Sequence, residues 1–231
     1  MVSAHAGGAP HLGVNALNAA MLGIQSIHAL RETFRDDDTV RVHPIITKGG
    51  EAVSAVPADV RMETFVRGRT IEAILDANHK VDRALRAGAL AVGAQVTIQT
   101  IPGYLPIYQS KDMADVFRAN AVGLVGEDNI GQVHHRTGST DMGDVSHLMP
   151  AIHPYVGGAT GLGHGATYVV EDYHLAVITA AKAMAATVVD ALAEGAAKGG
   201  KIVAQHRPEM TRQEYLGLLR SLAKEETFES A

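Results

Sequence analysis

Apolar residues recur at two kinds of spacing along the first hundred residues. Spacings of three and four predict amphipathic helices over residues 13–34 and 70–92. Strict alternation over residues 59–67 predicts a half-buried strand, and short apolar runs at 40–46 and 94–101 predict two more strands. The predicted order of elements is therefore helix, strand, strand, helix, strand.

This order is typical of an α+β domain with two layers, the split βαβ sandwich of ferredoxin-like type. Such a sandwich has one more strand before its first helix. The chain begins almost at the loop that would follow that strand. We therefore expect the sheet to have an exposed edge, or the chain to be truncated.

Helical patterns dominate the second half of the chain. Residues 102–106 resemble a linker, and a helix is expected over 110–125. A long alanine-rich helix is expected at 173–194, followed by a connector at 198–208 and a final helix at 211–223.

The long alanine-rich helix is expected to be buried in the protein and not to span a membrane. Its most apolar section, residues 175–192, carries Lys182 and Asp190. The N-terminus has neither the charged nor the apolar region of a signal peptide. No membrane association is expected, and the absence of cysteine fits a cytoplasmic protein.

Composition narrows the chemistry that is open to this chain. None of the 231 residues is cysteine, so any metal must be held by histidine and carboxylate side chains. The net charge of −5 comes from interspersed acidic and basic residues, and no basic cluster indicates nucleic-acid binding. The hydrophobic share of 46% is enough to form a core.

Residues 138–164 concentrate side chains that can do chemistry. Asp141, Asp144 and His164 lie there among glycines, which let backbone approach a ligand closely. His164 stands between two glycines, so its imidazole can face a cleft, where a neutral nitrogen suits zinc. The alternative is a solvated loop histidine. The two aspartates could orient a metal-bound histidine or act as turn and cap residues.

His5 is a second candidate, because it lies among small residues near the N-terminus. It could donate a hydrogen bond to a developing oxyanion in acyl transfer; the alternative is an exposed terminal histidine. The chain has no helical zinc pair, no nucleophile elbow and no phosphate loop. A hydrolytic site with two metal ions needs several ligands and a general base, and this sequence offers one good ligand.

An ordered set of motifs resembles the zinc-dependent aminoacylase and carboxypeptidase family. The motifs are Ser3–Ala6 with Pro10–Leu17, Gly49-Gly50 with Val56–Asp59, the strand ending at Arg67, and Gly138–Ser146 with Pro150 and Ile152–Tyr155. The most similar branch contains amidohydrolases that act on aminobenzoyl-glutamate or unusual dipeptides. The resemblance covers the chain up to about Leu192.

The resemblance implies an α/β enzyme whose catalytic domain binds two zinc or manganese ions and is interrupted by a ferredoxin-like lid. Residues 1–103 would be this lid, which forms a homodimer, and 104–231 the C-terminal part of an incomplete catalytic domain. His164 corresponds to the last metal ligand of the family. His5 corresponds to a lid histidine that reaches the partner subunit's site and polarises the scissile carbonyl.

The resemblance also implies that Asp141, Asp144, Asn15 and Ser54 line the substrate site. Ser54 stands where the family commonly has asparagine, which alters one substrate contact. The family's N-terminal half would carry the other metal ligands and the catalytic glutamate, and this sequence does not contain it.

Two main functional hypotheses follow. The first is an amidohydrolase for a small-molecule amide, namely an N-acyl amino acid, a dipeptide or an aminobenzoyl-glutamate-like compound, which would need the absent half. The second is a truncated, non-catalytic dimerisation module. A ferredoxin-like domain that binds a small molecule is a third possibility, because this fold hosts many functions.

Overall fold

A computed structural model describes residues 2–131 and 135–230 of the chain. The chain divides into two compact units, and each is described by itself. The first unit comprises Met1–Pro106, Thr137–Ser139 and Leu216–Ala231, and the second comprises Ile107–Arg136 and Thr140–Tyr215.

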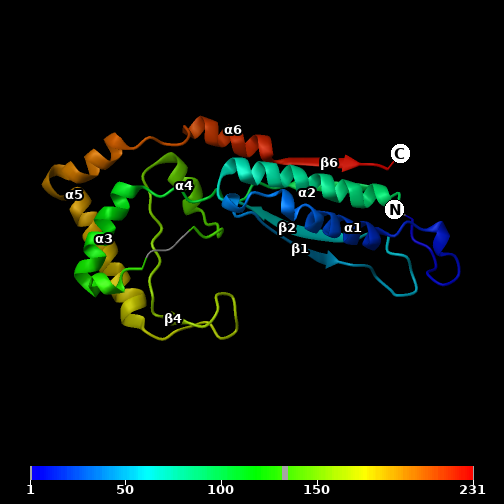
Figure 1. Ribbon diagram of the computed structural model, residues 1–231, viewed down its shortest axis with the longest axis horizontal. Helices are drawn as coiled ribbons and strands as arrows, with labels where there is room; N and C mark the ends of the chain where they lie inside the picture. Colours follow the sequence, from blue (N-terminus) through cyan, green and yellow to red (C-terminus); the bar gives the residue numbers. More distant parts are fainter. Residues whose placement is uncertain (1, 132–134, 231) are drawn as a thin grey trace. The chain divides into compact units, whose positions relative to one another are not determined.

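The first unit is built from two helices and a β-hairpin. Helices α1 (Ala16–Ala29) and α2 (Ile71–Ala91) lie side by side and cover one face of the antiparallel pair β1 (Arg41–Lys48) and β2 (Arg61–Arg67) (Figure 1). Short 3₁₀ turns at Pro10–Leu12, Arg31–Thr33 and Asp36–Asp38 connect these elements. The α/β class and the order of these elements are as the sequence predicts.

Small residues let α1 and α2 approach each other closely. A Cβ atom added to Gly88 of α2 would lie 2.4 Å from the backbone nitrogen of Gly23 in α1, so only glycine fits there. The core beside this crossing consists of Ile27, Val42, Val81 and Ala84. Helix α2 begins at Thr70, whose side chain accepts a hydrogen bond from the amide of Ala73.

The third predicted strand pairs with a segment that sequence analysis did not assign as a strand. Strand β3 (Val96–Thr100) runs antiparallel to β6 (Lys224–Phe228), near the C-terminal end of the chain. Among the described residues, β3 and β6 form one two-stranded sheet and β1 and β2 another, so the expected single sheet is divided. The sequence Lys-Glu-Glu-Thr-Phe lacks apolar alternation, which explains why β6 gave no strand signal.

A buried carboxylate marks the contact of β6 with α2. Asp82 is buried, and its Oδ2 atom lies 3.8 Å from Nζ of Lys224 and accepts a hydrogen bond from Asn78 at 3.2 Å. Burial raises the pKa of Asp82, and the nearby positive charges of Lys224 and Arg86 oppose this rise. The contact between α2 and β6 therefore includes an ion pair whose carboxylate is desolvated.

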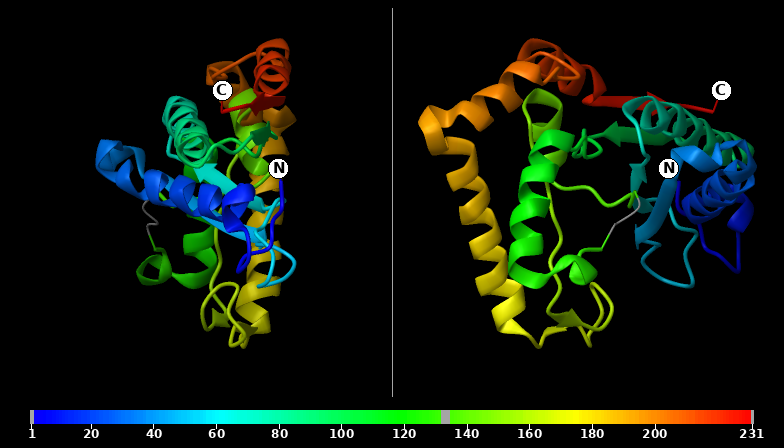
Figure 2. Two further views of the ribbon diagram at one scale, coloured as in Figure 1. Left: turned by 90° about the vertical axis from the view of Figure 1, so that its right-hand side faces the viewer. Right: turned by 60° about the vertical axis from the view of Figure 1, so that its left-hand side comes forward.

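The second unit is mainly helical. Helix α3 (Lys111–Val125) lies beside α5 (Ala180–Gln205) (Figure 2). The other elements are the 3₁₀ turn Glu127–Asn129, α4 (Met142–Leu148), the hairpin of β4 (Ala159–Thr160) and β5 (Val169–Val170), and the π-helical turn His174–Thr179. Helix α6 (Arg212–Leu222) begins in the second unit and ends in the first.

Helix α5 differs from its prediction in two ways. The predicted stop near Gly195 is a local break at Ala193–Ala196, and the helix resumes to Gln205 where a connector was expected. The helix was also expected to be buried, but only Ala183, Thr187 and Ile202 are. The expectation of a buried helix was therefore wrong for this chain, because among the described elements α3 covers only one side of α5.

Candidate functional site

The segment around His5 is held in place by strand-like pairing within the first unit. Residues 4–6 run antiparallel to residues 54–56, and an isolated bridge joins His5 to Ala55. The amide that follows His5 donates to the carbonyl of Ser54 at 2.8 Å. Two residues that the resemblance places at the substrate site, His5 and Ser54, are thus neighbours in the fold.

The imidazole of His5 has a defined orientation. Its Nδ1 atom accepts hydrogen bonds from the backbone amides of Gly7 at 3.1 Å and Gly8 at 2.8 Å. An acceptor nitrogen carries no proton, so the neutral ring carries its proton on Nε2. The side chain is exposed, and Nε2–H is therefore available to donate to a ligand. This arrangement suits stabilisation of an oxyanion.

Asn15 is the N-cap residue of helix α1. Its Oδ1 atom accepts hydrogen bonds from the amides of Leu17 at 3.0 Å and Asn18 at 3.1 Å, which caps the N-terminus of α1. The next residue, Ala16, donates its amide to the carbonyl of Pro57 at 2.9 Å. This places Asn15 near the segment that pairs with His5, while a contact with substrate stays a prediction.

The beginning of the predicted 138–164 motif is anchored on the first unit. Ser139 Oγ accepts a hydrogen bond from Arg67 Nη1 at 3.1 Å, and Thr137 Oγ1 donates to the carbonyl of Thr39 at 3.1 Å. The Arg67 guanidinium also lies 4.9 Å from the ring centroid of Phe65. In the sequence Arg67 stands at the end of a predicted strand, where its guanidinium can contact an anion.

The two aspartates of the motif lie at the start of helix α4. Asp141 precedes the helix and accepts a hydrogen bond from Thr140 at 2.8 Å. Asp144 lies in the first turn and accepts a hydrogen bond from the hydroxyl of Tyr215. Burial raises the pKa of Tyr215, and the charge and hydrogen bond of Asp144 raise it further. Asp144 therefore helps to attach α4 to α6 within the second unit.

Further contacts fix α4 in the second unit. Ser146 is buried, donates to the carbonyl of Gly143 at 2.6 Å and accepts from the amide of Tyr108 at 2.9 Å. The buried ring of His147 stacks on the ring of Tyr108, with centroids 6.1 Å apart. Helix α4 is short and contains a glycine, which explains why its helical pattern was not recognised.

His164 lies in the loop between β4 and β5. It is exposed, and its backbone has a φ of 63°, in the left-handed region that costs non-glycine residues free energy. The amide of the next residue, Gly165, donates to the carbonyl of Leu162 at 2.8 Å, which closes a tight turn. Strained backbone of this kind is common at ligand-binding positions, which favours a role for His164.

The residues that the structure describes do not form a complete metal centre. Within residues 2–131 and 135–230, no group of three or more histidine, aspartate or glutamate side chains is close enough to hold a metal ion. A zinc ion takes three or four protein ligands. His164 can therefore contribute only part of such a centre.

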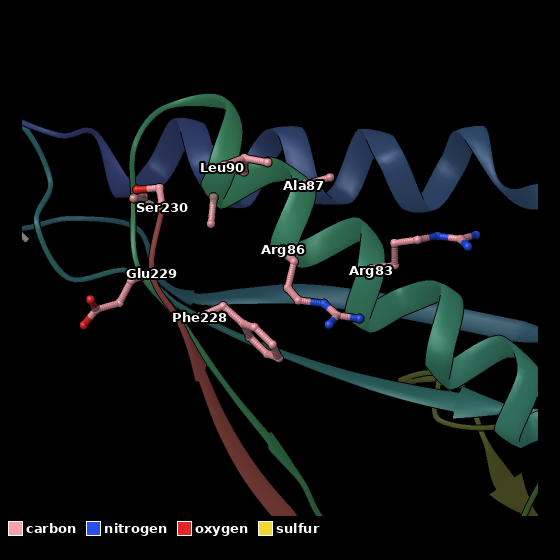
Figure 3. A pocket seen from close by; sticks show the side chains of 9 residues that line it. Arg83, Arg86, Ala87, Leu90, Phe228, Glu229 and Ser230 are labelled. Carbon is pink, nitrogen blue, oxygen red and sulfur yellow. The ribbon is translucent and has the colours of Figure 1, made fainter.

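A hollow of about 340 Å³ lies elsewhere in the first unit, between the C-terminal end of α2 and the last residues of the chain (Figure 3). The Arg86 guanidinium lies 4.5 Å from the ring centroid of Phe228 at its border. The predicted site residues do not line this hollow.

Comparison with known proteins shows which domain family the first unit resembles. Residues 2–92 match the model of the peptidase dimerisation domain. This part of the chain is similar to a peptidase dimerisation domain. The match includes His5, Asn15, Ser54 and Arg67, and it confirms the α/β lid that the resemblance implied. The domain's name indicates association between subunits.

Two curated proteins are similar to most of the chain. The Xaa-Arg dipeptidase of Mus musculus is 31% identical over 211 residues, which cover 85% of this chain and 48% of the mouse protein. The Xaa-Arg dipeptidase of Homo sapiens is 28% identical over 200 residues, which cover 82% of this chain and 45% of the human protein. The chain spans about half the length of the curated relatives it matches. Together with the dimerisation domain, these relatives confirm the family resemblance.

Proposed function

We propose that this chain is part of an amidohydrolase that cleaves the amide bond of a dipeptide or of a related small molecule. N-acyl amino acids and aminobenzoyl-glutamate-like compounds belong to the same substrate class. The proposal is supported by the two dipeptidase relatives and by the peptidase dimerisation domain. Since the chain spans about half of each relative, we infer that activity needs the complementary part of a catalytic domain.

The orientation of His5 is the observation that carries this proposal. Amide hydrolysis passes through a tetrahedral intermediate with negative charge on the former carbonyl oxygen. A histidine whose Nδ1 accepts from Gly7 and Gly8 presents Nε2–H as a fixed donor, and a fixed donor needs no reorganisation as charge develops. We assign this role to His5, acting in the site of the partner subunit of a homodimer.

We propose His164 as one ligand of the metal centre of the complete enzyme. A neutral imidazole is a good zinc or manganese ligand, and the left-handed backbone at His164 holds the residue in a tight turn. The remaining ligands and the general base would come from the complementary part. Bound metal ions would supply Lewis-acid chemistry at the substrate carbonyl. We infer that Asp141 lines the same site.

We further propose that Arg67 binds the carboxylate of the substrate. A dipeptide ends in a carboxylate, and a guanidinium matches its two oxygens with two parallel hydrogen bonds. Arg67 donates a hydrogen bond to Ser139 of the Gly138–Ser146 motif, and its guanidinium lies over the Phe65 ring. The proposed carboxylate contact and Ser139 of the motif therefore lie together at one end of β2.

A reconstitution experiment tests the proposal. The chain is mixed with the complementary part of the mouse Xaa-Arg dipeptidase, produced separately, and release of arginine from a dipeptide is measured with zinc or manganese. Turnover is expected from the mixture and not from either part alone. His5→Ala is expected to lower turnover at least about a hundredfold, as loss of an oxyanion donor does in other hydrolases. His164→Ala is expected to lower turnover because it removes a proposed metal ligand. His11→Ala is the matched control and should leave turnover unchanged.

The alternative function is a non-catalytic dimerisation module. The observation that favours it is the lack of any group of three possible metal ligands among the described residues, beside a dimerisation domain. It predicts a stable dimer in analytical ultracentrifugation and no turnover in any mixture. A strictly monomeric chain would contradict it.

A further inference from the structure

The hollow beside the C-terminal end of α2 combines an apolar wall with two cations (Figure 3). The wall consists of Phe228 and Leu90 with neighbouring alanines, and the cations are Arg83 and Arg86. All the residues that line the hollow belong to the first unit. Its volume of about 340 Å³ falls within the range of roughly 300–1,000 Å³ that is usual for small-molecule sites.

Helical spacing places the cations and the apolar wall on one side of α2. Arg83, Arg86 and Leu90 follow each other at intervals of three and four residues, so their side chains are neighbours on the helix surface. Phe228 of β6 lies against them, with its ring centroid 4.5 Å from the Arg86 guanidinium. A guanidinium that stacks on a ring keeps the N–H groups at its edge free for hydrogen bonds. Arg86 therefore presents donors at the border of an apolar surface.

The nearest carboxylates are paired with another cation. Asp82 and Glu226 both form ion pairs with Lys224. In the part of the chain that the structure describes, Arg86 donates one side-chain hydrogen bond, from Nε to the carbonyl of Asp82 at 3.3 Å, and forms no ion pair. Its two terminal nitrogens are left to a ligand. The two carboxylates also disfavour a second negative charge on that ligand, because like charges repel.

A third carboxylate at the hollow is also engaged elsewhere. Glu229 accepts a hydrogen bond from Nε2 of Gln95 at 2.9 Å. Its side chain points away from Arg86, as Figure 3 shows. Arg83, which is exposed on the preceding turn of α2, has no hydrogen bond or ion pair among the described residues. The hollow therefore holds positive charge that the chain itself does not neutralise.

We propose that this hollow binds a small monocarboxylic acid with an apolar or aromatic body. The carboxylate accepts hydrogen bonds from the terminal nitrogens of Arg86, for which its two oxygens are the matching acceptors. The body lies against Leu90 and Phe228, and Arg83 adds positive charge that attracts the anion. The site is separate from the one proposed for the amide substrate, whose carboxylate we assign to Arg67, so the two proposals can fail independently.

A titration followed by NMR tests the proposal. The nitrogen-15-labelled chain is titrated with phenylpropionate, and shifts are expected at the backbone amides of Leu90, Ala94 and Phe228. The expected Kd is about 1 mM, as is usual for a ligand of this size. Phenylpropanol has the same ring without the charge, and propionate has the charge without the ring. Each should bind at least about fivefold more weakly, because each lacks one of the two contacts.

Substitutions at the two contacts separate their roles. Arg86→Gln should weaken binding of phenylpropionate roughly tenfold, because it removes the charged donors, and Arg86→Lys should fall between Arg86→Gln and the native chain. Leu90→Ala should weaken binding roughly fivefold through lost apolar contact. Leu12→Ala is the matched control for Leu90→Ala, since the two leucines are 66% and 67% exposed and Leu12 does not line the hollow. Arg41→Gln is the control for Arg86→Gln, because Arg41 is exposed on β1.

Each outcome decides for or against the proposal. Binding that maps to the hollow and is weakened by Arg86→Gln and Leu90→Ala, but by neither control, supports it. If circular dichroism shows that Arg86→Gln is unfolded, the exposed Leu90 position decides. Equal binding of phenylpropionate and phenylpropanol overturns the proposal, as does the absence of saturable shifts. It is also overturned if the shifts centre on Arg67 and Ser139, because the acid then occupies the proposed substrate site, and the proposed function stands.

Discussion

The Nδ1 atom of His5 accepts a hydrogen bond from the backbone amide of Gly8 at 2.8 Å. This bond, together with the one from Gly7, determines which ring nitrogen carries the proton. The chain thus holds a donor in a fixed direction on a segment of small residues, where few other contacts restrain the ring. The relationship can be tested without any catalytic assay.

We predict that neutral His5 exists as the Nε2–H tautomer. Nitrogen-15 NMR of the labelled chain above pH 8 should show an unprotonated Nδ1 and a protonated Nε2, because the two backbone donors leave no room for a proton on Nδ1. His11 serves as the reference and should show a mixture of tautomers. A protonated Nδ1 at His5 would contradict the hydrogen bonds and the role proposed for this residue.

A second prediction concerns the crossing of α1 and α2. Gly88→Ala should lower the free energy of unfolding by about 1–3 kcal/mol, because overpacking at this point forces the helices apart. The added Cβ would meet the backbone of Gly23 at 2.4 Å and the Ala19 carbonyl at 2.5 Å. Urea unfolding followed by circular dichroism measures the change.

Gly217→Ala is the control for this prediction. Gly217 lies in α6, and a Cβ there has no atom within 4 Å. Replacing it should raise stability by about 0.5–1 kcal/mol, because alanine has the higher helix propensity. An unchanged or higher stability of Gly88→Ala would show that the helices are not in close contact.

Much of the first unit could be predicted from the sequence because its elements are strongly periodic. The strand at 61–67 alternates and the helix at 71–91 has a regular stripe, and both were placed within two residues. Strand β6 could not be predicted, since it is polar and its partner β3 is more than a hundred residues away in sequence. Pairing between distant polar segments leaves no local signal.

The candidate site was only partly accessible from sequence. The resemblance gave His5 and Ser54, and the structure brings them together through the pairing of 4–6 with 54–56. The sequence could not indicate that Asp144 contacts Tyr215, because that contact joins separate helices. The burial expected for α5 failed for a related reason: the apolar pattern of a helix does not indicate which other elements cover it.

A third prediction concerns the buried carboxylate of Asp82. Burial raises its pKa above the ordinary value of 3.8, so the folded state binds a proton more tightly than the unfolded state. The stabilisation from this proton is complete below pH 3.8 and is lost as pH rises through the folded-state pKa. At neutral pH the ionised group therefore destabilises the fold, because its ion pair with Lys224 is 3.8 Å long.

Asp82→Asn should therefore raise the melting temperature at pH 7, since asparagine keeps an acceptor for Asn78 and carries no charge. The difference from the native chain should shrink as the pH falls toward 3.8. Asp76→Asn on the same helix removes only an exposed ion pair with Lys80 and should lower stability by no more than about 1 kcal/mol. A lower melting temperature of Asp82→Asn at pH 7 would show that the Lys224 pair outweighs desolvation.

The last prediction separates function from stability at His164. Its φ of 63° costs a non-glycine residue about 1–2 kcal/mol, and glycine removes this cost. His164→Gly should therefore leave the melting temperature unchanged or slightly higher, while turnover of the reconstituted enzyme falls.

His153→Gly is the control, because His153 has no positive φ and its ring centroid lies 5.5 Å from that of Tyr155. This variant should lower the melting temperature. If both variants lose stability equally, the left-handed turn is not strained, and the structural argument for a ligand role of His164 fails.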